Sequence, residues 1–478
     1  MIVTKRWLED FIDISKIDTN EICTKLNSIG LEVDSLNKIR IPAGVVVGYV
    51  ESKEKHPDAD KLSICQVNIG NETTQIVCGA KNVAAGQYVP VATVGCVLSE
   101  DFKIKKAKLR GVESLGMICS STEIGLPKLN DGILELDNSI GELVLGKELN
   151  EYRLINDDVI EIELTANRGD CLSINGVARE LSACYELPLL EQEKNLDYND
   201  MGIGQLLEIE CASSIDSSLI YKAADFDDFN LPLLNKLRVA FLDEYKESNF
   251  NNVLTYATHS TGVIINAYAK KDSDSINDLA VLHVKKGENG FDEVYGTSKL
   301  STISIDKEEL NCDDTTFILE ASYNNPEELS KNVFEKKIKT GQMYYRTSRG
   351  SEPDIQMGMD YFTTLISKLG AKLYRGYEIF IEDKERLTID INIKRVNSII
   401  GKSVSKIKIE KILSSLGFIV KDGNAGVLSV QVPPFRHDIK NIADVTEEIV
   451  RIIGIDNIES RPLLIDEANR VNETSNSL

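Results

Sequence analysis

The feature that most constrains the fold is a run of short apolar segments, separated by regularly spaced glycines, between residues 39 and 148. Three of these segments are rich in β-branched and aromatic residues and are predicted to be strands: 45–50, 63–68 and 88–93. The glycines that separate or follow them are Gly70, Gly79, Gly86, Gly95 and Gly111. Short strands joined by regular turns are typical of small barrels, so this part of the chain is predicted to be all-β.

A basic run lies within the predicted barrel, in a chain that is otherwise acidic. Its five cations fall within eight residues: Lys103, Lys105, Lys106, Lys108 and Arg110. Alternation along a strand would place Lys106, Lys108 and Arg110 on one face, where they could contact successive phosphates of RNA. The alternative is a solvated edge strand whose lysines prevent strand pairing between molecules.

Length and charge limit the classes of function. At 478 residues the chain is long enough for roughly three to five domains. Its 76 acidic and 54 basic residues give a net charge of −22, which excludes nucleic-acid binding over the whole surface. The nine cysteines include no Cys-x-x-Cys pair, and no apolar run approaches the length of a membrane helix. The sequence therefore predicts a cytoplasmic protein with reduced thiols and no membrane partner, in which any RNA contact is local.

Helical periodicity appears on both sides of the predicted barrel. Asp18 is a candidate N-cap of a helix that Gly30 ends. The buried face of that helix would be formed by Ile22, Leu26 and Ile29. Further helices are predicted at 176–184 and 407–416, and further strands at 387–393 and 428–432.

A run of carboxylates follows two prolines near the end of the chain. Its members are Asp438, Asp444, Glu447 and Glu448. Asn441 can cap a helix on which the last three would share one face, and Asp438 could point back toward them. Carboxylates that converge in this way repel one another unless a cation such as Mg²⁺ neutralises them. The alternative is ordinary enrichment of acids in the first turn of a helix, which the helix dipole favours.

Several phrases of the sequence resemble known families. Residues 54–62, 75–82, 105–114 and 116–120 resemble the oligonucleotide-binding (OB) fold domain that is appended to several tRNA-handling proteins. The phrases at 7–8, 30–33 and 161–173, with Gly169 where a proline is usual, resemble the beta subunit of bacterial phenylalanyl-tRNA synthetase. The carboxylate run matches the spacing of the magnesium site in that family.

The resemblance implies a multidomain α+β fold with five parts. They are an N-terminal α/β domain from 1–38 and 149–205, an inserted OB-fold tRNA-binding barrel at 39–148, a mixed α/β editing-like domain at 206–385, a small α/β domain with a carboxylate-bearing helix at 386–465, and a linker or tail at 466–478. Members of the family are longer, so we expect this sequence to be an N-terminal fragment. The missing parts would be a catalytic-like domain and a domain that contacts the anticodon.

The resemblance also implies function. The family forms a heterotetramer of alpha and beta subunits that attaches phenylalanine to tRNA(Phe) using ATP, which the alpha subunit binds. The beta subunit binds tRNA through the basic run, supports assembly, holds Mg²⁺ at the carboxylate run and removes wrongly attached tyrosine. No DNA partner is expected, and the chain alone is expected not to aminoacylate tRNA. The competing interpretations are a non-enzymatic tRNA-binding and assembly module and, less favoured, a freestanding hydrolase of mischarged tRNA.

The family's editing residues look degenerate in this chain. By comparison with the family, Asn266 stands in place of a histidine, and Gly341 and Met343 occupy the positions of a Thr-x-Ala pair. Glu320 is retained, but the glycine-rich loop that should precede it is missing. We interpret 206–385 as a domain that keeps its fold and has lost most or all proofreading. The alternative is that the chemistry lies elsewhere, at His259 or His283.

Other polar residues are predicted to be structural. They are His56, Arg436, His437 and the segment 58–61. The sequence contains no Ser-His-Asp, Cys-His or Walker pattern that would indicate another enzyme class.

Overall fold

The computed structural model describes residues 1–192, 196–226, 229–276, 279–307, 310, 314–381, 386–423 and 426–459. The predicted tail at 466–478 lies outside the described residues. The chain divides into two compact units. The first consists of 1–386 together with 433–438, and the second of 387–432 and 439–478.

A small sheet organises the N-terminal part of the first unit. It has the order β1 (Ile2–Thr4), β12 (Asp158–Glu163), β2 (Glu32–Lys38), all antiparallel. Its helices are α1 (Lys5–Leu8), α2 (Thr19–Ser28) and α3 (Ile174–Tyr185). The Asp18 carboxylate accepts from the Asn20 N–H at 2.8 Å, which confirms the predicted cap. Because β2 and β12 pair although the barrel strands lie between them in sequence, the barrel is an insertion.

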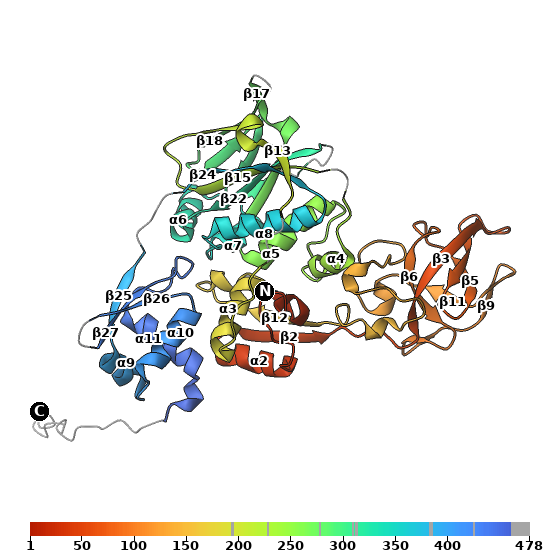
Figure 1. The fold of residues 1–478 in the computed structure, drawn as a ribbon, viewed down its shortest axis with the longest axis horizontal. Coiled ribbons are helices and arrows are strands. Elements are labelled where there is room, and N and C mark those ends of the chain that lie inside the picture. The colour runs from red at the N-terminus through yellow and green to blue at the C-terminus, as the bar shows by residue number, and fades with distance from the viewer. Residues whose placement is uncertain are drawn as a thin grey trace, which may run out of the picture. The chain divides into compact units, whose positions relative to one another are not determined.

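The predicted barrel is confirmed. Its five strands are β3 (Val45–Lys55), β4 (Ser63–Asn68), β5 (Thr73–Cys78), β6 (Tyr88–Thr93) and β11 (Gly116–Ile118). They are antiparallel in the order β11-β6-β3-β4-β5 (Figure 1). Between β5 and β11, Leu115 N–H donates to Gln75 O at 2.9 Å and Val77 N–H to Ser114 Oγ at 3.1 Å. These bonds leave the barrel nearly closed, with a seam where β5 and β11 form no regular ladder.

The basic run does not form the single strand that the sequence predicted. Two hairpins take its place: β7 (Val97–Ser99) with β8 (Phe102–Lys103), and β9 (Ala107–Leu109) with β10 (Val112–Ser114). Arg110 and Gly111 have positive φ values of 47° and 91° and form the turn between β9 and β10. The expectation that Arg110 shares a strand face with Lys106 and Lys108 is therefore wrong, because the strand ends at Leu109.

Two sheets and the helices α4 to α8 build the rest of the first unit. The first sheet has the order β13 (Tyr198–Gly202), β23 (Lys372–Arg375), β15 (Ser218–Asp225), β22 (Thr316–Tyr323), β16 (Ile264–Ala269), with β24 (Glu378–Phe380) also on β15. The second has the order β14 (Leu207–Cys211), β18 (Leu279–Lys286), β19 (Asp292–Tyr295), β20 (Lys299–Thr302), β21 (Asp306–Lys307), with β17 (Asp274–Ile276) on β18. The helices are α4 (Leu233–Ala240), α5 (Asn249–Thr261), α6 (Pro326–Lys336), α7 (Gln342–Thr347) and α8 (Ile355–Lys368).

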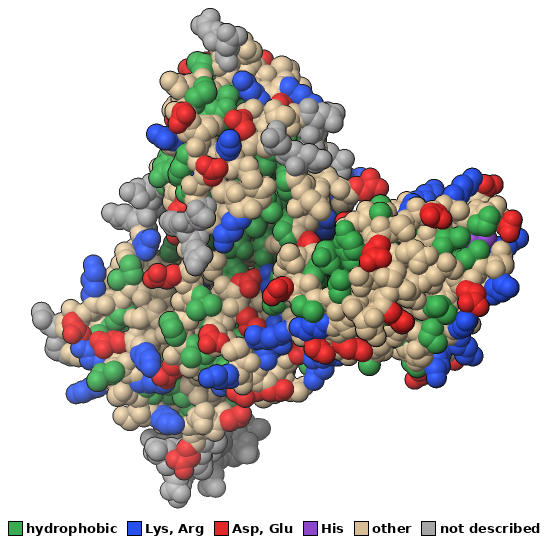
Figure 2. All heavy atoms as spheres, turned by 45° about the vertical axis from the view of Figure 1, so that its right-hand side comes forward, with side chains coloured by type: hydrophobic (Ala, Val, Ile, Leu, Met, Phe, Trp, Pro, Cys, Tyr) green, Lys and Arg blue, Asp and Glu red, His purple; other side chains and the backbone are tan. Residues whose placement is uncertain are grey.

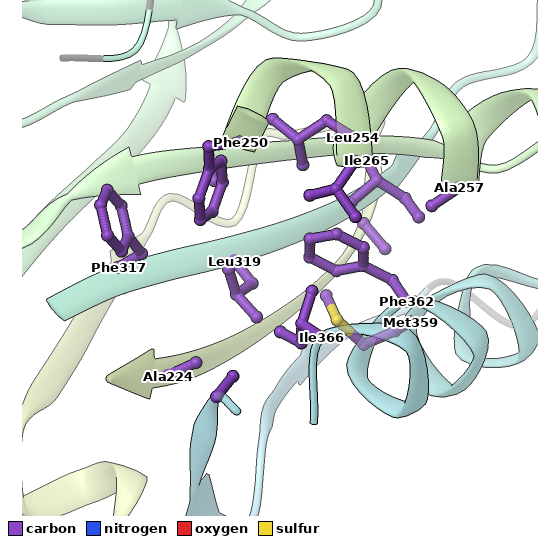
Figure 3. Close-up of a cluster of buried hydrophobic side chains, with 14 of the residues drawn as sticks. Ala224, Phe250, Leu254, Ala257, Ile265, Phe317, Leu319, Met359, Phe362 and Ile366 are labelled. Atoms are coloured by element: carbon purple, nitrogen blue, oxygen red, sulfur yellow. The ribbon is translucent and has the colours of Figure 1, made fainter. Parts of the chain in front are cut away.

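The strands of the first sheet bury both faces. On one face, Phe317 and Leu319 of β22 pack against Phe250 of α5 and Phe362 of α8 (Figure 3). On the other face, Tyr221 of β15 and Ile318 pack in a cluster with Leu282 and Val294 of the second sheet. Since side chains alternate along a strand, Glu320 of β22 follows Ile318 to the face between the two sheets. This placement decides the environment of the candidate editing residue.

The second unit is a three-stranded sheet with helices. Its strands have the order β25 (Thr388–Asn392), β27 (Val427–Gln431), β26 (Ile419–Asp422). Its helices are α9 (Ile393–Ile400), α10 (Lys406–Ser415) and α11 (Ile442–Ile453). The predicted elements at 387–393, 407–416 and 428–432 are confirmed to within about a residue at each end. Among the described residues, no helix is long and apolar enough to cross a membrane.

Candidate nucleic-acid interface and carboxylate sites

All five cations of the basic run are exposed. Lys106 is paired, with its Nζ 3.1 Å from an oxygen of Glu113 on the neighbouring strand β10. Within the described part of the chain, the other four form no ion pair. Figure 2 shows lysine and arginine side chains gathered at the right-hand end of the molecule, with acidic side chains between them. Unpaired cations on exposed hairpins are available for phosphates, which they contact without reading sequence.

His56 fixes the tip of the β9–β10 hairpin. The ring is buried, its Nδ1 accepts from the Asp58 N–H at 3.1 Å, and its Nε2 lies 3.1 Å from the Leu109 carbonyl oxygen. With Nδ1 as acceptor, Nε2–H is the donor to Leu109. His56 therefore joins the turn after β3 to the hairpin, as expected for a structural residue.

Glu320 lies at the centre of a buried polar cluster. Its register partners on the two neighbouring strands are Tyr221 of β15 and Asn266 of β16. Tyr221 Oη donates at 2.7 Å, Tyr268 Oη at 3.0 Å and Asn266 Nδ2 at 3.2 Å to the carboxylate. The residue is 0% exposed, and this burial raises the pKa of its carboxyl above the ordinary value. Three donors thus occupy a carboxylate that solvent does not reach.

Two further groups belong to the same cluster. Tyr268 Oη also lies 2.8 Å from Ser301 Oγ of the second sheet, and buried Asn266 Oδ1 has no hydrogen-bond partner among the described residues. Burial, then the charge of Lys246, lowers the pKa of Lys307 to about 8, and the charge of Lys307 acts on Glu320. The sequence analysis missed Lys307, and a lone lysine in a polar stretch carries no signal that would have revealed it.

The other candidate editing residues lie elsewhere. Gly341 is exposed and precedes α7, and Met343 is half-buried in its first turn. The structure brings Asn266 and Glu320 into contact. For the described residues, no hydrogen bond connects Gly341 or Met343 to that pair.

The two alternative histidines have other partners. His259 packs against Trp7 with ring centroids 5.0 Å apart. Its Nε2 lies 2.7 Å from Ile2 O, and its Nδ1 lies 2.9 Å from a guanidinium nitrogen of Arg346. Burial, and then the Arg346 charge, holds the pKa of His259 well below its usual range. His283 pairs with Glu210 at 2.8 Å and Asp274 at 3.0 Å. Neither contact set includes Glu320.

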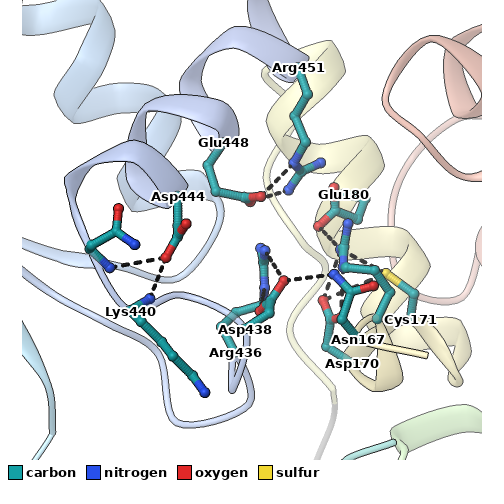
Figure 4. Close-up of polar contacts among 12 residues, drawn as sticks. Asn167, Asp170, Cys171, Glu180, Arg436, Asp438, Lys440, Asp444, Glu448 and Arg451 are labelled. Atoms are coloured by element: carbon teal, nitrogen blue, oxygen red, sulfur yellow. Dashed lines mark hydrogen bonds and ion pairs between the residues drawn. The ribbon is translucent and has the colours of Figure 1, made fainter. Parts of the chain in front are cut away.

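Asp438 belongs to the first unit, where its carboxylate is fully engaged. Arg436 donates to it from two nitrogens at 2.8 and 2.9 Å, and Asn167 Nδ2 donates at 3.2 Å (Figure 4). Burial alone would raise the pKa of Asp438, but the Arg436 hydrogen bond and charge hold it below its ordinary value. Arg436 thus has the structural role that the sequence predicted.

The remaining carboxylates of the run lie on α11 in the second unit. Asp444 accepts from the backbone N–H groups of Lys440 at 2.7 Å and Asn441 at 3.0 Å, which completes a capping box. Glu448 is buried and paired with Arg451, whose Nε lies 2.9 Å from it. Glu447 is exposed. The contacts of Asp444 are those of an ordinary acid in the first turn of a helix, which is the alternative to a metal ligand.

A buried ion network also lies in the N-terminal part of the first unit. The Arg168 guanidinium contacts Asp170 at 2.9 and 3.0 Å, Glu180 at 2.6 Å and the Cys171 sulfur at 3.0 Å. Asp170, Cys171 and Glu180 have the spacing of metal ligands. Since Arg168 already fills the centre of this group, the network is an ion-pair core of the fold.

Two family models match the chain. The model described as "Putative tRNA binding domain" matches residues 45–142, and the model described as "tRNA synthetase B5 domain" matches residues 389–455. The first match covers the barrel with its basic hairpins, and the second covers the sheet and helices of the second unit.

Curated relatives match almost the whole chain. The phenylalanine–tRNA ligase beta subunit of Sulfurimonas denitrificans is 45% identical over 480 residues, covering 98% of this chain and 61% of the relative. The subunit of Wolinella succinogenes is 46% identical over 487 residues, covering 99% and 62%. Among solved structures, an N-terminal fragment of the Pyrococcus horikoshii phenylalanyl-tRNA synthetase beta subunit matches at 12% identity and a TM-score of 0.32. The match covers 62% of this chain and 87% of that fragment.

The chain thus spans about three-fifths of the length of the curated relatives that it matches. With nearly its whole length aligned to them and a tRNA-binding and a B5 domain in place, the chain belongs to the family of phenylalanine–tRNA ligase beta subunits.

Proposed function

We propose that this chain acts as part of a cytoplasmic phenylalanine–tRNA ligase, which attaches phenylalanine to tRNA(Phe) using ATP. The identity of 45% over 98% of the chain to a beta subunit carries this proposal. The partner would be an alpha subunit that binds ATP and phenylalanine, in a heterotetramer. The chain itself would bind tRNA and support assembly, and would not aminoacylate tRNA alone.

The proposed tRNA contact is the pair of exposed hairpins. Lys103, Lys105, Lys106, Lys108 and Arg110 would contact phosphates there. The surrounding chain is strongly acidic, so these cations concentrate binding at one place. Binding of a tRNA(Phe) transcript to the chain should weaken steeply with salt, because each phosphate contact releases counterions. Absence of salt-sensitive binding would contradict the proposal.

We also propose that proofreading is weak or lost. Glu320 is sealed between two sheets, and its three donors leave no lone pair facing solvent that could orient a water on an ester. The test is hydrolysis of Tyr-tRNA(Phe) by this chain, with Glu320→Gln as the control. Hydrolysis above the spontaneous rate that disappears in Glu320→Gln would overturn this part of the proposal.

We also propose Mg²⁺ binding, but at fewer carboxylates than the four that the sequence predicts. The Asp438 carboxylate is paired with Arg436 and hydrogen-bonded by Asn167, and the Glu448 carboxylate is paired with Arg451. Neither carboxylate is therefore open to a cation as it stands. Support for Mg²⁺ is confined to the acids of α11, Asp444, Glu447 and Glu448, where an oxygen-rich site would have to displace Arg451. A rise in unfolding temperature on Mg²⁺ addition would test it.

The second candidate is a non-enzymatic tRNA-binding and assembly module. The burial of Glu320 beneath three donors favours it for this chain taken alone. The discriminating assay adds the alpha subunit to the chain and measures phenylalanine attachment to tRNA(Phe). Activity would favour the ligase subunit, whereas binding without activity would favour the module.

A further inference from the structure

A groove of about 690 Å³ lies at the open seam of the barrel. One wall is the end of β5 with Cys78, and another is β11 with the preceding Ser114. Residues between Phe102 and Leu109, including Lys103 and Lys105 of the basic run, form a third wall, and residues from Ser120 to Ile133 complete the lining. The groove thus lies where β5 and β11 are joined by single hydrogen bonds and form no regular ladder.

The groove combines apolar and cationic side chains that the fold does not require. Phe102 is 47% exposed and Leu109 is 40% exposed, so neither of these two side chains contributes much to the barrel core. Lys103 and Lys105 line the same groove and are exposed. Neither lysine has an ion-pair partner in the described ranges.

The rim of the groove is held in place. Ile104, between the two lysines, is 6% exposed and is bonded to the barrel through its backbone. Its N–H donates to Cys96 O at 2.8 Å, and its carbonyl accepts from the Gly95 N–H at 2.9 Å. Phe102, Lys103 and Lys105 are therefore presented by an anchored segment.

Two acids also line the groove, and both are already engaged. Glu123 accepts from the Ser120 N–H at 2.6 Å and from Ser120 Oγ at 2.8 Å. Asp131 pairs with Lys128 at 2.6 Å. Lys128 offsets the charge of Asp131, whereas Glu123 keeps its negative charge, so Lys103 and Lys105 leave the groove with a small excess of positive charge. The groove therefore suits an anion that also has a flat apolar face.

We propose that this groove holds an unpaired nucleotide of the bound tRNA, with its base stacked on Phe102 and its flanking phosphates on Lys103 and Lys105. This inference rests on the proposed tRNA binding and adds which part of the RNA is recognised. A duplex hides the faces of its bases, whereas a loop or end exposes them to aromatic rings.

The experiment uses the full chain and three RNA probes measured by fluorescence anisotropy. They are a tRNA(Phe) transcript, a short single strand with a central 2-aminopurine, and a blunt duplex containing the same sequence. Phe102→Ala should weaken single-strand binding about tenfold, since stacking on one aromatic ring is worth this much, and leave duplex binding unchanged. Quenching of 2-aminopurine on binding should disappear in the same variant.

Matched variants separate stacking from other effects. Phe102→Tyr keeps an aromatic ring and should retain single-strand affinity, whereas Phe102→Leu keeps apolar bulk and should lose it. Phe334→Ala removes a phenylalanine that is 84% exposed on α6, and should change none of the three affinities.

The outcomes distinguish the two proposals. Equal weakening of single strand and duplex by Phe102→Ala would overturn the nucleotide groove. Salt-sensitive tRNA binding that depends on Lys106 and Lys108 but not on Phe102 would overturn the groove and leave tRNA binding standing. A wild-type chain that binds no tRNA would overturn both.

Discussion

The Glu320 cluster and the basic hairpins are the two polar sites on which the proposed function depends, and they are opposite in kind. Glu320 is 0% exposed and receives three hydrogen bonds, so its bonding capacity is used within the protein. The hairpin cations are exposed, and Lys106 is the one with an ion pair among those described. A buried polar group with partners, such as Glu320, contributes to folding. An exposed cation without a partner in the described part of the chain, such as Lys108, is available to a ligand.

The largest expected effect is on stability, at the buried site. Glu320→Ala removes the acceptor of Tyr221, Tyr268 and Asn266. Tyr268 can still bond to Ser301, but Tyr221 and Asn266 lose the acceptor that they share. We expect the free energy of unfolding to fall by about 3 kcal/mol, because each of these two buried donors without a partner costs about 1 kcal/mol or more and the truncated side chain leaves a cavity. Urea unfolding, followed by circular dichroism, measures the change.

Glu320→Gln is the matched control, since it keeps the shape and one acceptor oxygen and should lose less stability. A Glu320→Ala variant as stable as the wild type would contradict this contrast between the two sites, because Glu320 would then have no structural role.

The next effect is on tRNA affinity, at the exposed site. Reversing Lys106 and Lys108 together to glutamate should weaken tRNA(Phe) binding about thirtyfold and lower the salt slope by about two, one per phosphate contact. The fold should be unaffected because both side chains are exposed. Anisotropy titrations at several salt concentrations provide the measurement.

Lys331→Glu with Lys336→Glu, on exposed positions of α6, is the charge-matched control. Equal loss of affinity in that control would show that overall negative charge, and not the hairpins, determines binding.

The pH dependence of stability also distinguishes the buried Glu320 site from the exposed hairpins. Burial raises the pKa of Glu320 from its ordinary value of 4.5. Between that value and the raised one, the folded protein keeps a proton that the unfolded chain has lost. Stability therefore falls as pH rises through this window, by at most about 1.4 kcal/mol per pH unit.

Urea unfolding of the wild type and Glu320→Gln at a series of pH values isolates this effect. The wild type should lose stability relative to the variant as pH rises above 4.5, since the amide does not titrate. Parallel curves for the two proteins would mean that Glu320 titrates normally, against the burial that the structure shows.

The sequence could predict what depends on local patterns. The strands at 63–68 and 88–93 and the Asp18 and Asn441 caps follow from residues that are neighbours in sequence. Alternation of side chains predicts a strand through Arg110, but the structure has a turn there, because the following Gly111 favours the positive φ that a two-residue hairpin turn requires.

The contacts of the candidate sites could not be predicted in the same way. Asn167 and Asp438 are 271 positions apart in sequence, yet they share a hydrogen bond that takes up part of the carboxylate. The partners of Glu320 come from other strands, so their identity depends on sheet register. A carboxylate run suggests repulsion until the arginines that neutralise it are located. Arg451 follows Glu448 by three residues on α11, a spacing at which helical ion pairs form, so this one partner could have been predicted from the sequence.

The smallest effect concerns Asp444, which lies between the two extremes because it is half-buried and bonded to backbone donors. Asp444→Ala removes one half of the capping box of α11 and should lower the stability of the second unit by about 0.5–1 kcal/mol. Glu447→Ala, at an exposed position three residues further on, should change it by less than about 0.5 kcal/mol. Thermal unfolding with and without Mg²⁺ compares them. If Asp444 acts as a cap, its loss has the same effect in both conditions. If Mg²⁺ binds α11, both substitutions abolish a stabilisation that appears when the ion is added, and the site changes from a satisfied group to one that is completed by a ligand.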